Sequence, residues 1–199
     1  MDPYVYPGTN VLKNFRDIRD LNTLGEFEMN MTTRRLAELA HRPKPGKFDI
    51  PQLKAIHAHI FQDVYPWAGK FRTVNIARPG QFYFAFSEQI GPCLANLFAE
   101  LLREKYLATT TTSQDFCNRA GYYMGELNAI HPFRDGNGRS QREFIRRLAL
   151  KHGRTLNWSR VTRTAMKEAS ILSFQQADSS GLAALLLNAI GDDGNPPAA

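Results

Sequence analysis

The segment from His131 to Arg142, HPFRDGNGRSQR, gathers the residue types that phosphate chemistry needs. Gly136 and Gly138 allow the backbone to turn its amide groups inward. The helix expected to begin at Gly138 or Arg139 adds unpaired N–H groups and a positive dipole end. The segment therefore predicts a cradle for an anion.

Charged side chains flank this cradle in the sequence. Arg139 and Arg142 are three residues apart, so on a helix they share one face, and their planar guanidinium groups suit phosphate oxygens. Asp135 can hold a Mg²⁺ ion that bridges those phosphates. His131, with a solution pKa of about 6.5, can accept a proton from an attacking hydroxyl. Together these residues indicate nucleotidyl or phosphoryl transfer.

Each residue also has a plainer interpretation. His131 precedes Pro132 and can simply end a helix, while the arginines between 139 and 147 can form a solvated basic face. Their occurrence in one short window favours the functional interpretation, because a single geometry explains all of them.

Two other motifs are excluded by direct comparison. An EF-hand loop that begins at Asp135 needs Gly and Glu at the positions where Ser140 and Arg146 stand. A Walker A loop needs the pattern GxxxxGK[ST] after a strand, whereas this loop reads DGNGRS and follows a helical segment.

The segments that must position this loop are predicted to be mostly helical, because apolar residues recur at helical spacing. The predicted helices cover residues 20–41, 50–64, 88–106, 113–130, 138–152, 159–176 and 180–190. Asp49 is expected to cap the second of them, with Pro51 in its first turn.

One β-hairpin is predicted at 72–86. Val74 and Ile76 alternate with polar residues, RPGQ places Pro and Gly where a type II turn needs them, and aromatic residues alternate from Phe82 to Phe86. Such a hairpin offers an open edge to which another chain can add a strand. A purely structural hairpin, with aromatics that fill the core, is the alternative.

Composition sets the wider limits. The chain has 199 residues, 43% of them hydrophobic, and is expected to form one domain over 1–199, with a core at about 45–190 and a flexible tail at 192–199. The absence of an apolar leader or spanning segment predicts a cytoplasmic protein, with a longer secreted effector as the alternative. A formal charge of +6 fits nucleic acid, nucleotide or an acidic protein surface. Cys93 and Cys117 are predicted to be buried thiols.

The motif HPFRDGNGR followed by SQR resembles the Fic family signature HxFx[DE]GNGRxxR at every specified position. DPYVYPGTNVLKN, FDIPQLKAIHAHIFQDVYPWAGKFR, RAGYYMGELNAIHPF and NWSRV also resemble the short bacterial Fic toxins, so the resemblance covers nearly the whole chain. It implies an all-α bundle of about seven helices with one small hairpin, the flap.

The resemblance implies transfer of AMP from ATP to a hydroxyl side chain of a target protein. His131 would be the base and Asp135 would hold Mg²⁺. The related Doc toxins transfer the γ-phosphate and have Lys where this chain has Gly138, which favours AMP transfer here. Transfer of UMP, phosphate or phosphocholine, and a non-catalytic module that binds nucleotide or DNA, are the alternatives.

Further roles follow from the same resemblance. Phe133 would anchor the loop in the core, and the hairpin at 72–86 would position the target segment. The residues expected to hold the phosphates of ATP are Gly136, Asn137 and Gly138 at the α-phosphate, with Arg139 and Arg142 at the β- and γ-phosphates.

Many members of the family are silenced by a helix that bears [ST]xxxE[GN]. The chain has only one [ST]xxxE match, from Thr164 to Glu168, and Ala169 follows it instead of Gly or Asn. By resemblance, the chain is therefore expected to be the toxin of a toxin–antitoxin pair whose small antitoxin bears that helix and contacts Arg142. DNA gyrase and topoisomerase IV subunits are the expected targets; no direct contact with nucleic acid or a membrane is required.

Overall fold

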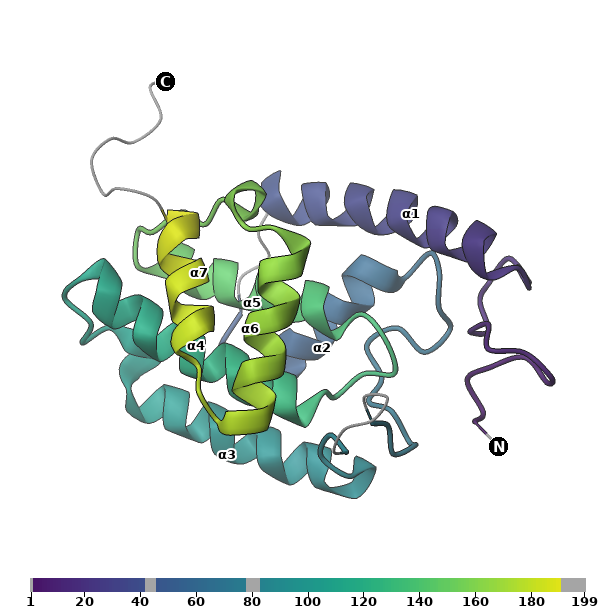
Figure 1. Cartoon of the computed structure of the whole chain (residues 1–199), viewed down its shortest axis with the longest axis horizontal. Helices are drawn as coiled ribbons and strands as arrows, with labels where there is room; N and C mark the ends of the chain where they lie inside the picture. The colour runs from purple at the N-terminus through teal and green to yellow at the C-terminus, as the bar shows by residue number, and fades with distance from the viewer. Residues whose placement is uncertain (1, 42–45, 78–82, 191–199) are drawn as a thin grey trace. The chain divides into compact units, whose positions relative to one another are not determined.

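The computed structural model describes residues 2–41, 46–77 and 83–190. Within these ranges the chain forms seven α-helices and three short 3-10 helices, labelled η (Figure 1). The α-helices are α1 (Leu21–His41), α2 (Ile50–Phe61), α3 (Ile90–Arg103), α4 (Ser113–Ile130), α5 (Asn137–Lys151), α6 (Arg163–Gln176) and α7 (Ser180–Ile190). The 3-10 helices are η1 (Ser87–Gln89), η2 (Lys105–Leu107) and η3 (Trp158–Arg160). The predicted all-α class is confirmed, with helix ends within a few residues of the expected positions.

The start of α2 shows why the sequence-based bounds succeed. Asp49 has extended backbone angles, and its side chain accepts a hydrogen bond from the Gln52 N–H at 2.9 Å, while Pro51 lies in the first turn. This cap satisfies an N–H group that the helix itself leaves without a partner.

The predicted hairpin at 72–86 is not present as a pair of strands in the described residues. One isolated antiparallel bridge joins Ala77 to Tyr83, and the Phe84 N–H donates to the Ile76 carbonyl at 3.2 Å. The predicted turn falls on residues 78–82, outside the described ranges. We call the described parts, residues 72–77 and 83–86, the two arms of the flap segment.

Side chains form hydrogen bonds with backbone groups in and next to the two arms, where a regular hairpin would pair strand with strand. The Arg72 guanidinium donates to the carbonyls of Val74 and Ala85, and the Asn75 side chain accepts from the Ser87 N–H at 2.8 Å. These bonds hold the arms together without regular strand pairing, which explains why alternation in the sequence overpredicted strand here.

The chain forms two compact units, each defined by contacts among its own residues. The first contains residues 1–91 and 131–143, and the second contains residues 92–130 and 144–199. The motif segment and the flap segment therefore both belong to the first unit. The expectation of one domain over 1–199 with a core at 45–190 stays a prediction, and the predicted tail at 192–199 lies outside the described residues.

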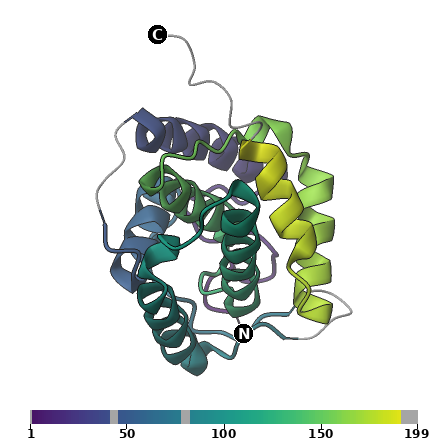
Figure 2. The same ribbon diagram turned by 90° about the vertical axis from the view of Figure 1, so that its left-hand side faces the viewer.

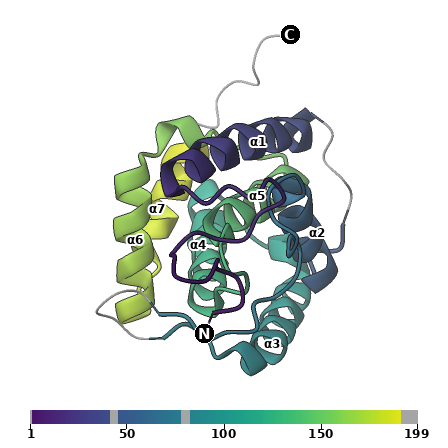
Figure 3. The same cartoon turned by 90° about the vertical axis from the view of Figure 1, so that its right-hand side faces the viewer.

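In the first unit, α1 packs on α2 (Figure 3). Arg35 of α1 forms a two-pronged ion pair with Asp63, just past α2, at 2.6 and 2.8 Å. Leu39 of α1 and Leu53 of α2 are each 1% exposed. At the N-terminus, Asp2 pairs with Arg134 of the motif loop at 2.8 Å. The first unit thus gathers several elements around the motif.

In the second unit, α7 packs against both α4 and α6, and α6 and α7 lie side by side (Figures 1 and 2). Cys117 of α4 is a buried thiol, as predicted. Cys93 is only partly buried, because it lies near the start of the amphipathic α3 and not on its most buried face. Among the helices of the described ranges, none is long and apolar enough to cross a membrane.

Gly121 allows α4 and α7 to approach closely. A Cβ placed on Gly121 would lie 2.9 Å from the Ala183 nitrogen of α7, closer than real Cβ atoms come to backbone. Gly25 of α1 is the matched control, because a Cβ placed there meets nothing within 4 Å.

We expect Gly121→Ala to lower the free energy of unfolding by about 1–3 kcal/mol through overpacking, despite the better helix propensity of Ala. Gly25→Ala should instead raise it by roughly 0.5–1 kcal/mol. Urea unfolding of both variants checks this; a Gly121→Ala protein as stable as Gly25→Ala would contradict the described packing.

Candidate active site

His131 follows directly after the end of α4 and has a left-handed backbone conformation, with φ +49°. Its carbonyl oxygen accepts a hydrogen bond from Arg72 Nε at 2.8 Å. Its imidazole stacks on the ring of Phe84, with centroids 3.9 Å apart and planes inclined by 17°. The residue thus ends a helix and also holds a partly exposed imidazole in a defined orientation.

The loop after His131 is closed by Asn137. Its Oδ1 accepts from the Phe133 N–H at 2.9 Å, and its Nδ2 donates to the Phe133 carbonyl at 2.8 Å. Both Phe133 and Asn137 are buried, which confirms that Phe133 lies in the core as expected. The Asn137 side chain therefore shapes the loop, and only its backbone N–H remains for a phosphate.

Gly136 is required by close packing. It has φ +79°, and a Cβ placed there would lie 2.3 Å from the ring of Phe61. The Gly136 carbonyl accepts the first helical hydrogen bond of α5, from the Ser140 N–H at 3.1 Å. The N–H groups of residues 137–139 therefore have no acceptor within the helix. They lie where the sequence predicts an anion cradle, and the binding of a phosphate there stays a prediction.

The two motif arginines have different surroundings. Arg139 donates from Nη2 to Glu28 of α1 at 2.6 Å, and from Nη1 to Thr32 at 3.2 Å. Its guanidinium also lies over the Phe61 ring, 4.6 Å from the centroid. Arg139 is thus already engaged with α1, and its expected contact with β- and γ-phosphates has to coexist with the Glu28 ion pair.

Arg142 lies beside the first turn of α5. Its Nη1 stands 3.3 Å from where a Cβ on Gly138 would be. This position brings a guanidinium next to the cradle, as the spacing predicts, and a larger side chain at Gly138 would press against it.

Asp135 has an exposed side chain, one oxygen of which accepts from the Gly136 N–H. The pKa of Asp135 is raised, first by desolvation from the surrounding protein atoms and then by the negative charge of Glu28. Among the described residues, no group of three or more His, Cys, Asp and Glu side chains could hold a metal ion. A lone carboxylate such as Asp135 suits Mg²⁺ only where phosphate and water supply most of the other ligands, so the Mg²⁺ site stays a prediction.

His57 of α2 holds the backbone of the motif loop through a hydrogen bond to one of its carbonyls. Its Nδ1 accepts from the Gly69 N–H at 2.8 Å, so the proton lies on Nε2, which donates to the Asp135 carbonyl at 3.0 Å. Its ring stacks on Phe133 and on Phe61, with centroid distances of 3.8 and 4.6 Å. These contacts fix the tautomer of His57 and the orientation of the Asp135 carbonyl, which directly precedes Gly136.

Three residues of this site were missed by sequence reasoning: Glu28, His57 and Arg72. His57 had a weak signal, because it interrupts the apolar face of α2 between Ile56 and Ile60. Glu28 and Arg72 had none, since each meets its partners only through folding.

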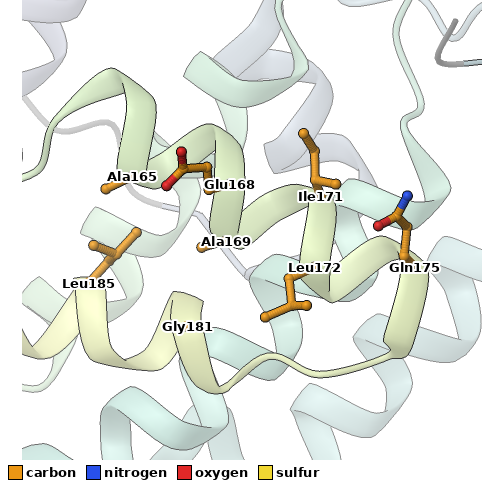
Figure 4. Close-up of a pocket in the computed structure, with 8 residues that line it drawn as sticks. All are labelled: Ala165, Glu168, Ala169, Ile171, Leu172, Gln175, Gly181 and Leu185. Carbon is orange, nitrogen blue, oxygen red and sulfur yellow. The ribbon is translucent and has the colours of Figure 1, made fainter.

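A separate pocket of about 520 Å³ lies in the second unit between α6 and α7 (Figure 4). Its lining residues are Ala165, Glu168, Ala169, Ile171, Leu172, Gln175, Gly181 and Leu185. None of them belongs to the predicted site.

Burial lowers the pKa of His57 from its ordinary 6.5 to about 4, and the positive charge of Arg139 adds to this shift. The folded state therefore keeps His57 neutral, while the unfolded state gains a proton once the pH falls below 6.5. We predict that this group removes roughly 3 kcal/mol of unfolding free energy between pH 6.5 and 4, and nothing above pH 6.5.

Urea unfolding of the wild type and of His57→Gln at several pH values measures this loss, since the variant lacks the titrating group. His41→Ala is the control, because it removes an exposed histidine of α1 and leaves His57 in place. Equal slopes for the wild type and His57→Gln would refute the prediction.

The sequence of the chain is similar to those of known proteins. The model of the Fic/DOC family matches residues 47–149. The chain is 44% identical to the protein adenylyltransferase VbhT of Bartonella schoenbuchensis over 87% of this chain, and spans 36% of the length of that protein. It is 40% identical to the probable protein adenylyltransferase y4lH of Sinorhizobium fredii, over 87% of this chain and 88% of that protein.

A solved structure shares the fold. The BepC protein of Bartonella tribocorum, with bound AMPPNP, aligns with a TM-score of 0.88 and 30% identity over 94% of this chain and 95% of that one. With the intact motif, the buried Phe133 and the cradle at the start of α5, these matches show that the chain belongs to the Fic/DOC family.

Proposed function

We propose that this chain is a protein adenylyltransferase that transfers AMP from ATP to a hydroxyl side chain of a target protein. The motif loop is the observation that supports this proposal most. It brings the imidazole of His131, the carboxylate of Asp135 and the first turn of α5 close together in the sequence. The curated relatives are named protein adenylyltransferases. Solved relatives with bound AMPPNP or ADP support a nucleotide as the donor.

In this mechanism the target hydroxyl oxygen attacks the α-phosphorus while His131 accepts its proton. The bond from the α-phosphorus to the bridging oxygen breaks, and pyrophosphate leaves. The N–H groups of residues 137–139 and the Arg142 guanidinium stabilise the negative charge that develops. Asp135 would hold Mg²⁺, which neutralises phosphate charge when bound.

We further propose that the chain is the toxin of a toxin–antitoxin pair and acts in the bacterial cytoplasm. Its targets would be DNA gyrase and topoisomerase IV subunits, docked at the flap segment. Within residues 1–199 the one [ST]xxxE match, Thr164 to Glu168, is followed by Ala169, and we assign the inhibitory helix to a separate protein. The exposed rings of Tyr83 and Phe86, at 61% and 49%, offer a surface for a target at the flap segment.

The first test is label transfer from ATP labelled at the α-phosphate, compared with ATP labelled at the γ-phosphate, in the presence of Mg²⁺ and purified topoisomerase subunits. We expect target labelling from the α form only. His131→Ala should slow it about 10²- to 10⁴-fold, the usual contribution of a general base. His41→Ala, which changes an exposed histidine of α1, should label like the wild type.

Each other result has a definite meaning. Label from the γ form would mean phosphate transfer and a reversed ATP orientation. No label from either form, with nucleotide still bound, would favour a non-catalytic binding module. Labelling of proteins other than the topoisomerases would keep AMP transfer and reject the proposed targets.

Arg142 tests the proposed inhibitor. We expect Arg142→Ala to raise the KM for ATP and also to reduce inhibition by a synthetic helical peptide that contains [ST]xxxE[GN], because both would use this guanidinium. Arg103→Ala, at an exposed arginine of α3, is the control. An Arg142→Ala protein that binds ATP normally and stays fully sensitive to the peptide would reject this role.

A further inference from the structure

Among the described residues, Arg72 is the largest of the side chains that are almost completely buried, with 2% of its surface exposed. Burial of a guanidinium is costly, and desolvation lowers the pKa of Arg72, although an arginine remains charged inside a protein. A buried charge of this kind persists only where its hydrogen bonds offset the lost hydration.

The donors of Arg72 reach three carbonyl oxygens from two parts of the chain. Nε donates to His131 at 2.8 Å, Nη1 donates to Val74 at 2.7 Å, and Nη2 donates to Ala85. Val74 and Ala85 lie on opposite arms of the flap segment. One rigid planar group therefore connects the candidate base to both arms.

Two further contacts connect the same parts. The Arg72 N–H donates to the Pro132 carbonyl at 3.0 Å, and the ring of Phe84, on the second arm, stacks on the His131 imidazole. His131 itself has a φ of +49°, a conformation that costs free energy for a residue other than glycine. The hydrogen bond to its carbonyl and the stacking of its ring on Phe84 hinder the backbone of His131 from relaxing to a negative φ.

From these contacts we propose that Arg72 is a positioning residue, which holds His131 and both arms of the flap segment in one fixed arrangement. The surface that would receive the target and the imidazole that would accept the target's proton are then set by the same group. Lysine cannot replace it, because a single ammonium lacks the planar fork that spans three acceptors. The catalytic part of this proposal rests on the proposed AMP transfer.

The test compares Arg72→Lys with Arg119→Lys. Arg119 of α4, in the second unit, is also a multiply bonded arginine, paired with Glu104 at 3.0 Å and Glu100 at 3.1 Å. Arg119→Lys therefore controls for the general loss of a structural arginine. Phe84→Leu provides a second perturbation of His131, which leaves the bonds of Arg72 in place.

For Arg72→Lys we expect kcat for AMP transfer to fall about 10- to 100-fold, since a small displacement of a reacting group has effects of this size. The affinity for ATP should stay within about twofold of the wild type, since no phosphate contact is removed. Arg119→Lys should lower the melting temperature without this loss of kcat. Thermal unfolding is measured for every variant, and kcat is expressed per folded molecule.

NMR of the His131 imidazole gives a readout that does not depend on catalysis. Its nitrogen signals should move in Arg72→Lys and in Phe84→Leu, and stay in place in Arg119→Lys. In the double variant Arg72→Lys/Phe84→Leu, the loss of kcat should be smaller than the product of the single losses, because both changes act on one side chain.

Three results would overturn the proposal. They are an unchanged His131 signal in folded Arg72→Lys, a kcat equal to that of Arg119→Lys, and losses that multiply in the double variant. Failure of the proposed function is seen separately, as a wild-type protein that labels no target from α-labelled ATP. If Arg72→Lys does not fold, the signal shift and kcat of Phe84→Leu decide whether the flap segment orients His131.

Discussion

The ring of Phe61 leaves no room for a side chain at position 136, and the rest of the site is arranged around this contact. A Cβ on Gly136 would stand 2.3 Å from that ring, so the backbone of the motif loop lies directly against α2. The same ring stacks on His57 and faces the guanidinium of Arg139. One aromatic side chain therefore sets the position of the loop, of its supporting histidine and of a motif arginine.

Around this contact, the motif loop is held mainly through its backbone. Arg72 bonds the carbonyl of His131, Asn137 bonds both backbone groups of Phe133, and His57 bonds the carbonyl of Asp135. This support acts on the backbone of the loop, so the positions of the His131 imidazole, the Asp135 carboxylate and the first N–H groups of α5 are set through the chain that carries them. Such preorganisation reduces the reorganisation needed when charge develops in a transition state.

The carboxylates of Glu28 and Asp135 and the guanidinium of Arg139 influence each other at the motif loop. Glu28 pairs with Arg139, and the pKa of Asp135 is raised by desolvation and then by the negative charge of Glu28. A cation at Asp135 would lower this raised pKa, and the phosphates of a nucleotide bound as proposed would share Arg139 with Glu28. Through Glu28, α1 contributes to the charges of the site from more than 100 residues away in sequence.

The sequence by itself determined the helical class, most helix bounds and the motif, because those follow from local spacing, caps and residue types within a few turns. It overpredicted strand at 72–86, because alternation cannot reveal that Arg72 takes carbonyls a ladder would use. It also missed Glu28, His57 and Arg72, and did not separate Arg139 from Arg142. These were decided only by the tertiary structure, because a buried polar group is defined by partners that are distant in the chain, and no local pattern encodes which of them it will meet.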